Sequence, residues 1–215
     1  MPKQQLTYPL DRKTIDVLNR YIREKAINFI LDIVWRSHFY FFTAFESSDR
    51  FLTSATGSFQ GVTSDGLELE VDSGSSNTTE LTLSVPDDTL IDYTKRTRIR
   101  TAVQVSSVSD FEVSAGNRIR FLIDDDVIKG FVSDGSNTSF VTLGTAATGT
   151  FYELEARYFP NDKTVFYLDK REAGVITDRF PAGNTILCSF SIERTAGSAT
   201  KNANMSFFEM IQGKL

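Results

Sequence analysis

The sequence predicts an all-β sandwich preceded by a helical arm, and three observations support this prediction. From about Phe45 onward, short alternating or apolar runs are separated by clusters of Gly, Ser, Asn and Asp, as is typical of a β-sandwich. The 18 Phe residues cannot all lie at the surface, so most are expected between two packed sheets. Residues 15–33 instead show helical periodicity, which divides the chain into an arm, residues 1–43, and a sandwich, residues 44–215.

The arm carries one apolar stripe whose residues recur at alternating steps of three and four, as on one face of an α-helix. Asp11 or Thr14 offers a side-chain oxygen to cap the start of this helix. A helix this apolar packs either on its own sandwich or on another subunit, and periodicity alone does not distinguish the two. The second arrangement would make the protein a homo-oligomer. The candidate assembly-interface residues are Ile15, Leu18, Ile22, Phe29, Ile33 and Trp35.

The sandwich region is expected to consist of strands joined by short turns. Gly, Asn and Asp tolerate left-handed backbone angles, and they fill segments such as residues 114–117, 133–137 and 160–163. Apolar and charged residues alternate in the run Tyr152–Tyr158, which predicts a strand with one buried side. The predicted strands are residues 67–71, 80–85, 98–105, 118–124, 127–133, 139–144, 152–159, 164–169, 174–177, 186–194 and 205–211.

Composition argues against several kinds of site. The net charge of -5 disfavours a general nucleic-acid binder, which needs a clustered basic surface. The single Cys188 permits no intrachain disulfide, and one His with one Cys cannot build a zinc site of imidazoles and thiolates. The most apolar early run, Ala26–Trp35, is too short to span a bilayer and lies too deep for a signal peptide. We therefore expect synthesis inside the cell, no membrane insertion and no cofactor.

A strand, a polar turn, a second strand, a short third strand and a proline follow one another between residues 152 and 181. The positions that define this pattern are Tyr158, Val165, Phe166, Tyr167, Asp169, Gly174 and Pro181. They resemble the central hairpin of the concanavalin A-like lectin/glucanase superfamily, in which three such strands are antiparallel. Residues 169–174 stand where that family usually has a tight Asp-Gly turn, so a longer turn is expected.

The resemblance covers roughly residues 45–215 and implies a jelly roll of two stacked antiparallel sheets, one of them concave. It also implies that the closing strand, near residues 204–211, pairs back with the first strand. Its functional implication is broad, because the family includes glycan-binding lectins, polysaccharide hydrolases and domains of phage and virus particles. A short apolar arm that leads into one bare sandwich looks most like the last group.

We therefore expect a non-enzymatic structural or binding component of a virion, that of a tailed phage. The arm would anchor it to other virion proteins of the capsid or tail, and the sandwich would face outward in a decoration, fibre or adhesion role. A host-surface glycan is a further expected partner. The alternatives are a lectin-like carbohydrate-binding module and a glycoside hydrolase.

The hydrolase alternative would use Glu68 or Glu70. Retaining sandwich glucanases carry two Glu flanking an Asp on one strand face, because one carboxylate attacks while the other donates a proton. Here the order is Glu68, Glu70, Asp72 and no Trp lies near, so a solvated strand face is the favoured interpretation. Glu153 and Glu155 are interpreted in the same way, and no catalytic residue is expected.

Two other reactive side chains are also assigned structural roles. Cys188 shares a strand face with apolar residues, which predicts a buried, inert thiol. His38 stands beside an aromatic run without an accompanying nucleophile, so a packed histidine is expected.

Three consecutive carboxylates, Asp124–Asp126, are the strongest metal candidate, because calcium prefers several oxygen ligands. Consecutive residues of a strand or tight turn point in different directions, so a polar hairpin turn is favoured and no metal site is expected. A calcium ion shared with Asp134 or Asn137 is the alternative.

The densest basic cluster of the chain contains Arg96, Arg98 and Arg100, which would share one strand face. Arg118 and Arg120 follow on a strand that is expected to neighbour it. One interpretation is a sheet face balanced by acidic residues of residues 67–72 or 152–158. The other is a contact to an anionic partner, either an acidic protein surface or a sulfated or sialylated glycan.

Overall fold

The computed structural model describes residues 39–43, 51–53, 58–63, 66–72, 78–84, 91–181, 184–185 and 187–213. The predicted helical arm and His38 lie outside these ranges, and so does the side chain of Cys188. The candidate assembly-interface residues Ile15, Leu18, Ile22, Phe29, Ile33 and Trp35 also lie outside the described residues. Within the described ranges, no helix is long and apolar enough to cross a membrane.

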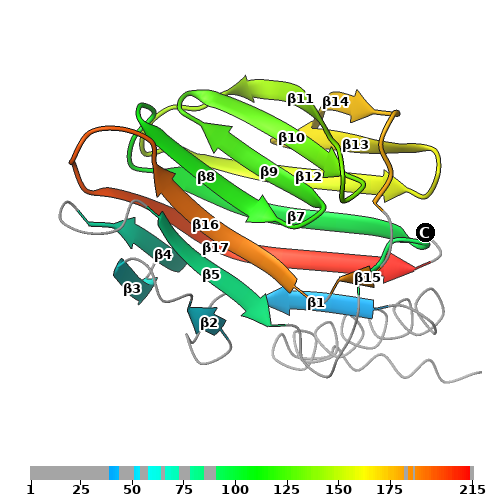
Figure 1. Ribbon diagram of the computed structural model, residues 1–215, viewed down its shortest axis with the longest axis horizontal. Helices are drawn as coiled ribbons and strands as arrows, with labels where there is room; N and C mark the ends of the chain where they lie inside the picture. Colours follow the sequence, from blue (N-terminus) through cyan, green and yellow to red (C-terminus); the bar gives the residue numbers. More distant parts are fainter. Residues whose placement is uncertain are drawn as a thin grey trace, which may run out of the picture. The chain divides into compact units, whose positions relative to one another are not determined.

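Sheet A is the larger of two stacked antiparallel sheets (Figure 1). Its strands are β1 (Phe39–Thr43), β3 (Ser58–Thr63), β4 (Gly66–Val71), β7 (Arg96–Val105), β12 (Phe151–Phe159), β13 (Lys163–Leu168), β14 (Arg171–Ile176) and β17 (Lys201–Gly213). They run in the order β14-β13-β12-β7-β17-β4-β3, and β1 pairs with β17. The closing strand therefore pairs with the first described strand, as the resemblance implied.

Sheet B lies against sheet A (Figure 1). Its strands are β2 (Phe51–Thr53), β5 (Thr78–Ser84), β8 (Phe111–Gly116), β9 (Ile119–Asp124), β10 (Val127–Ser133), β11 (Thr138–Thr145) and β16 (Leu187–Arg194). They run in the order β11-β10-β9-β8-β16-β5-β2, while β6 (Ile91–Asp92) and β15 (Asn184–Thr185) form a separate pair. The prediction of an all-β, two-sheet antiparallel sandwich is confirmed for the described residues, which contain no helix.

Aromatic and aliphatic side chains fill the space between the sheets. In β12, Leu154, Ala156 and Tyr158 are each 1% exposed, so the alternation in this strand buries one face as predicted. Phe121 of sheet B and Phe166 of sheet A meet edge to face, with ring centroids 5.9 Å apart. The largest fully buried side chains are Tyr158, Phe111, Phe121, Phe166, Phe190, Phe208, Leu67 and Leu69.

Two local predictions were wrong. Residues 114–117 were assigned to a turn, but Ser114, Ala115 and Gly116 complete β8, where short side chains are buried between β9 and β16. A longer turn was expected in residues 169–174, but β13 and β14 are joined by Asp169 and Lys170 alone. Both have positive φ, 49° and 69°, which is the conformation of a tight two-residue hairpin turn.

The strands of the sandwich also begin earlier than the boundary between residues 43 and 44. β1 lies before that boundary and pairs along its whole length with residues 208–212 of β17. The run FYFFT therefore belongs to sheet A, and its aromatic composition suits a strand rather than an arm.

Candidate functional site

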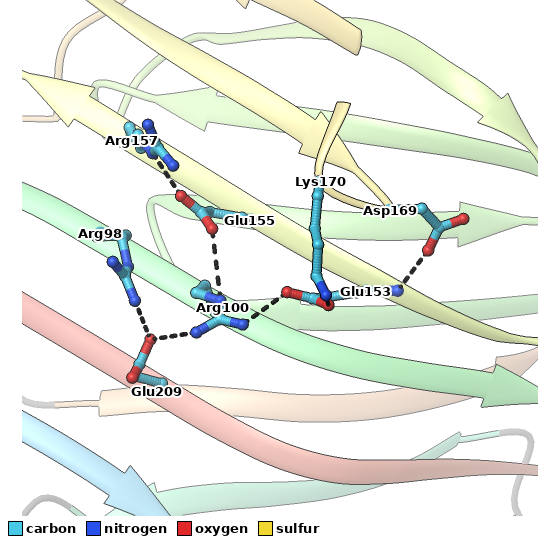
Figure 2. A network of polar contacts seen from close by, with 8 residues as sticks. All are labelled: Arg98, Arg100, Glu153, Glu155, Arg157, Asp169, Lys170 and Glu209. Carbon is cyan, nitrogen blue, oxygen red and sulfur yellow. Dashed lines mark hydrogen bonds and ion pairs between the residues drawn. The ribbon is translucent and has the colours of Figure 1, made fainter. Parts of the chain in front are cut away.

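The predicted basic cluster lies on the outer face of sheet A, in β7. Thr97, Ile99 and Thr101 are at most 1% exposed and point into the core, so the alternating arginines point outward. Arg96 is exposed, and its guanidinium carbon lies 5.3 Å from the ring centroid of Phe159. The other two arginines enter an ion-pair network (Figure 2).

Arg100 is the centre of this network because its direct cross-strand partners are both glutamates, Glu155 in β12 and Glu209 in β17. Its Nη1 donates to Glu209 Oε2 at 3.2 Å, and its Nη2 donates to Glu153 Oε1 at 2.6 Å. Its Nε lies 3.4 Å from Glu155 Oε2. Arg98 Nη2 donates to the same Glu209 oxygen at 2.7 Å, so two arginines share one buried carboxylate.

Two further cations and one further carboxylate join the network. Arg157 forms an ion pair with Glu155, and Lys170 Nζ lies 3.6 Å from Glu153 Oε2. The backbone N–H of Glu153 donates to Asp169 Oδ1 at 3.0 Å. The cations Arg98, Arg100, Arg157 and Lys170 thus face the anions Glu153, Glu155 and Glu209, while Asp169 binds the backbone of Glu153 (Figure 2).

This pairing limits the chemistry of the outer face of sheet A. The hydrogen bond from Arg100 holds the pKa of Glu153 below its ordinary value. A general acid for glycoside hydrolysis needs the opposite shift, so Glu153 is suited to remaining ionised. Of the three predicted arginines, Arg98 and Arg100 are neutralised locally by carboxylates of β12 and β17.

The carboxylates of the hydrolase alternative lie on the same outer face, in β4. Leu67 and Leu69 are fully buried, so Glu68 and Glu70 point outward, and Asp72 is exposed. Glu68 Oε1 accepts a hydrogen bond from Asn202 Nδ2 at 2.6 Å. The burial pattern of this strand agrees with the favoured interpretation of a solvated strand face.

The second pair of arginines does not neighbour the first. Arg118 precedes β9 and Arg120 lies in it, so both belong to sheet B rather than to the sheet that contains β7. The expectation that they lie on an adjacent strand was wrong because the chain crosses from sheet A to sheet B between β7 and β8, and β8 to β11 form a series of hairpins in sheet B.

Aromatic side chains follow Arg120 across the outer face of sheet B. Arg120 is the cross-strand partner of Phe131, which in turn is the partner of Phe140. The two rings stack with centroids 5.5 Å apart, and the Arg120 guanidinium carbon lies 5.1 Å from the Phe131 centroid. Lys129 Nζ lies 5.8 Å from the Phe140 centroid. Phe140 is nonetheless 61% exposed, which is unusual for a large apolar side chain.

Two hollows border this ring pair. The first, here called the arginine pocket, has a volume of about 360 Å³ and is lined by Asn117, Arg118, Arg120, Phe131, Ser133, Gly135 and Thr138. The second, the edge groove, has a volume of about 400 Å³ and is lined by Thr138, Ser139, Phe140, Val141, Val175, Ile176, Thr177 and Asp178. Because both contain Thr138, the two hollows adjoin.

The centre of the same face is made of short side chains. Ser114 of β8 lies between Ser191 of β16 and Leu122 of β9 in one cross-strand row. Ser114 is 9% exposed and Leu122 is 6% exposed, so neither side chain projects far from the sheet. The outer face of sheet B therefore combines a low, hydroxyl-bearing centre with an aromatic and cationic end.

Its other end is acidic. Glu112 of β8 lies directly between Asp124 of β9 and Glu193 of β16. Burial raises the pKa of Glu112, and the negative charges of Asp124 and Glu193 raise it further, against the opposing effect of Arg120 and Lys129. Lys129 Nζ also forms an ion pair with Asp124 Oδ2 at 2.6 Å.

The structure does not assemble the alternative calcium site. Asp124–Asp126 precede β10, whereas Asp134 and Asn137 follow it, so the two groups lie at opposite ends of one strand. Asp125 Oδ1 accepts from the Phe111 N–H, and Asp134 Oδ1 accepts from the Ser136 and Asn137 N–H groups. Among the described residues, no group of three or more His, Cys, Asp and Glu could hold a metal ion.

Sequence reasoning missed Phe131, Phe140 and Glu112 as surface features. The sequence contained a usable signal, because residues two positions apart lie on the same face of a strand. Phe131 shares its face with Lys129 and Ser133, and Phe140 shares its face with Thr138 and Thr142. An aromatic residue on an otherwise polar strand face indicates exposed apolar surface. The hollow beside it depends on three strands and a turn, which no local pattern reveals.

Comparison with known proteins shows the fold. No family model and no curated protein matches the sequence. The Bacillus licheniformis β-glucanase superposes with a TM-score of 0.61 at 14% identity, over 82% of this chain and 98% of the glucanase chain. The protein therefore has a jelly-roll fold like that of the glucanase.

Two larger proteins contain a similar domain. A chain of botulinum neurotoxin type C, which enters cells in dependence on an interaction with two ganglioside molecules, matches with a TM-score of 0.57 at 9% identity over 77% of this chain. A sialidase matches with a TM-score of 0.54 at 12% identity over 75% of this chain. The chain spans only 44% of the neurotoxin chain and 17% of the sialidase chain.

Proposed function

We propose that the protein is a non-catalytic, lectin-like module that binds a glycan on the outer face of sheet B. The observation that carries this proposal is the stacked pair of the half-buried Phe131 and the exposed Phe140, which lies between two polar-rimmed hollows. A sugar ring offers an apolar C–H face to an aromatic ring and hydroxyl groups to the polar side chains around it. Ligand sites commonly combine aromatic walls with a few polar groups in this way.

The two outer faces differ in how well they suit such a ligand. On sheet A, the guanidinium and carboxylate groups of the network already bind one another, so a sugar would have to compete with ion pairs. On sheet B, the arginine pocket offers polar groups beside the ring pair, and Ser114 and Ser191 lie farther along the same face. Similarity to a β-glucanase and to a ganglioside-dependent neurotoxin supports a glycan as the ligand class.

The proposal is tested with two exposed phenylalanines, one on each face. Phe140 is 61% exposed and Phe151, on the outer face of β12, is 39% exposed, so neither substitution by Ala should unfold the protein. A glycan array on the wild type identifies ligands, and calorimetry then measures their Kd. We expect Phe140→Ala to weaken binding about tenfold or more, as aromatic anchors do, and Phe151→Ala to leave it unchanged. Equal effects of the two variants, or no glycan bound at all, would sink the proposal.

A second candidate function, glycoside hydrolysis, is favoured by one observation. Glu112 has a raised pKa, and the carboxylate of Asp124 lies directly opposite it on the neighbouring strand. Glycosidases use such a pair, in which the carboxyl group with the raised pKa is the general acid and the other carboxylate is the nucleophile or base. This assignment replaces Glu68 and Glu70. Incubating the identified glycans with wild-type protein and with Glu112→Gln, and measuring new reducing ends, distinguishes the two functions. Turnover that disappears in the variant would make the protein a hydrolase.

The virion role and the homo-oligomer predicted from the sequence depend on the arm, which lies outside the described residues. They stay predictions. The pairing of β1 with β17 changes how they must be tested, because a truncation at Ala44 would remove a strand of sheet A. A shortened chain for sizing experiments should therefore begin at His38, so that β1 is retained.

A further inference from the structure

Arg118 and Arg120 carry positive charge that the described residues do not neutralise. Neither side chain forms an ion pair there, in contrast with Arg98 and Arg100 on the other sheet. The cross-strand partners of Arg120 are Gly116 and Phe131, and neither is acidic. Arg120 lowers the pKa of Glu112 by its charge, without a hydrogen bond or ion pair between the two side chains.

The turn between β10 and β11 positions the second guanidinium. Gly135 has a φ of 102°, a conformation that favours glycine, and a Cβ added there would collide with Nη1 of Arg118, so the guanidinium lies directly against this turn. The nearby carboxylate, Asp134, is engaged elsewhere. It accepts the N–H groups of Ser136 and Asn137 and faces Arg179 Nε at 3.8 Å.

The remaining walls of the arginine pocket supply hydrogen-bonding groups and one aromatic surface. Ser133 and Thr138 contribute hydroxyl groups at the rim, and Phe131 contributes the ring over which Arg120 lies. A guanidinium group that lies over an aromatic ring, as that of Arg120 lies over Phe131, contacts the ring with its flat face. The N–H donors lie in the plane of that group, so they stay available to a ligand. The volume of about 360 Å³ lies within the usual range for small-ligand sites.

We infer that the arginine pocket is a subsite for an acidic sugar, one that bears a carboxylate or a sulfate ester. This inference rests on the proposed function and specifies its ligand. Guanidinium groups bind carboxylate and sulfate oxygens through two parallel N–H donors, and two adjacent arginines without an ion pair among the described residues leave such donors open. The acidic group would lie between Arg118 and Arg120, and the rest of the glycan would extend over Phe131 and Phe140.

The test uses three oligosaccharides with the same backbone: one neutral, one with a terminal carboxylate-bearing sugar and one with a sulfate ester. Calorimetry on the full chain measures each Kd at low and at high salt. We expect at least one acidic form to bind about tenfold or more tightly than the neutral form, and this advantage to shrink with added salt because charge pairing at an open pocket is screened. The stronger of the two acidic ligands identifies the source of the charge.

Two variants locate the effect. Arg120→Gln and Arg118→Gln should each remove most of the acidic advantage and leave neutral binding unchanged, whereas the Lys variants should retain part of it. Arg171→Gln is the matched control, because Arg171 is exposed and lies at the opposite end of β14 from Ile176, which lines the edge groove. Arg120 is itself exposed, so its variant should fold, and thermal unfolding checks this.

The outcomes separate the inference from the proposed function. If neutral and acidic ligands bind equally, or if the preference survives in Arg120→Gln, the acidic subsite is refuted while glycan binding stands. If neither neutral nor acidic glycans bind, both are refuted. Loss of the acidic preference in Arg171→Gln would also overturn the inference, because the effect would then come from net charge alone.

Discussion

The tripeptide Arg-Ile-Arg occurs twice, at residues 98–100 and at residues 118–120, and its two copies have different surroundings. Ile99 and Ile119 are each 1% exposed, and the arginines around them point away from the core in both copies. Arg100 lies between Glu155 and Glu209, whereas Arg120 lies between Gly116 and Phe131. The same local sequence thus produces a neutralised face on sheet A and a charged pocket on sheet B.

This difference shows that the direction of a strand side chain and the pairing of its charge have separate causes. The alternation of side chains decides which residues face the core, because successive residues of a strand point to opposite sides. The state of an outward charge is decided by its cross-strand partners, which come from distant parts of the chain. Glu209 is 109 residues from Arg100 in sequence. The network of sheet A therefore contributes to stability, while the pocket of sheet B keeps its charge for a ligand.

The largest expected effect tests what the two copies share. Ile99→Ala and Ile119→Ala each remove a buried side chain from the core between the sheets, so each should lower the free energy of unfolding by about 3 kcal/mol. Urea denaturation measures both losses. A loss below about 1 kcal/mol for either isoleucine would mean that its side chain is not packed in the core. The two Arg-Ile-Arg copies would then not share an inward-facing isoleucine. Val175→Ala, at a position 40% exposed, serves as a control with a small expected loss.

A smaller effect tests what separates the copies. Arg100→Ala removes the central cation of the network, so that Glu209, which is 8% exposed, keeps only Arg98, Glu155 keeps only Arg157 and Glu153 keeps only Lys170. We expect a loss of about 1.5 kcal/mol, because three partly or largely buried carboxylates each lose one of their two cationic partners. Arg120→Ala should cost less than about 0.5 kcal/mol, since no described carboxylate forms an ion pair with it. Equal losses would show that the two arginines have equivalent surroundings.

The smallest effect concerns two glutamates and has opposite signs on the two faces. The pKa of Glu153 is lowered by Arg100, so its contribution to stability is present above the ordinary value of 4.5 and is lost as the pH falls through the folded pKa. Glu153→Gln should therefore destabilise the protein at pH 7, and the difference from the wild type should vanish in acid.

For Glu112 the sign is reversed. Burial and the charges of Asp124 and Glu193 raise its pKa, so its contribution is fully present below 4.5 and is lost as the pH rises through the folded pKa. Glu112→Gln should be more stable than the wild type at pH 7 and equal to it in acid. Thermal unfolding of both variants between pH 3 and pH 8, about the range in which carboxyl groups titrate, measures the two curves. If both variants differed from the wild type with the same sign at pH 7, the predicted contrast between Glu153 and Glu112 would be wrong.

Most strands of the sandwich were predictable from sequence because alternation is a local property. In β12 and β4, apolar residues at every second position identified the buried side correctly. The prediction failed where small residues have two uses. Ser114–Gly116 has the composition of a turn, yet it is a strand because neighbours on both sides supply hydrogen-bonding partners. Asp169 and Lys170 form a tight turn without glycine, which the residue types did not indicate.

The sequence by itself determined that the described chain is all-β, that most of its aromatic residues fill a core and that Arg96, Arg98 and Arg100 share one strand face, because each follows from residue type and spacing. Only the tertiary structure decided that Arg98 and Arg100 are neutralised, that Arg118 and Arg120 lie on another sheet, and that two phenylalanines stack beside a pocket. These features depend on which strands become neighbours. Strand order is set by how the whole chain buries its apolar faces, and no short segment contains that information.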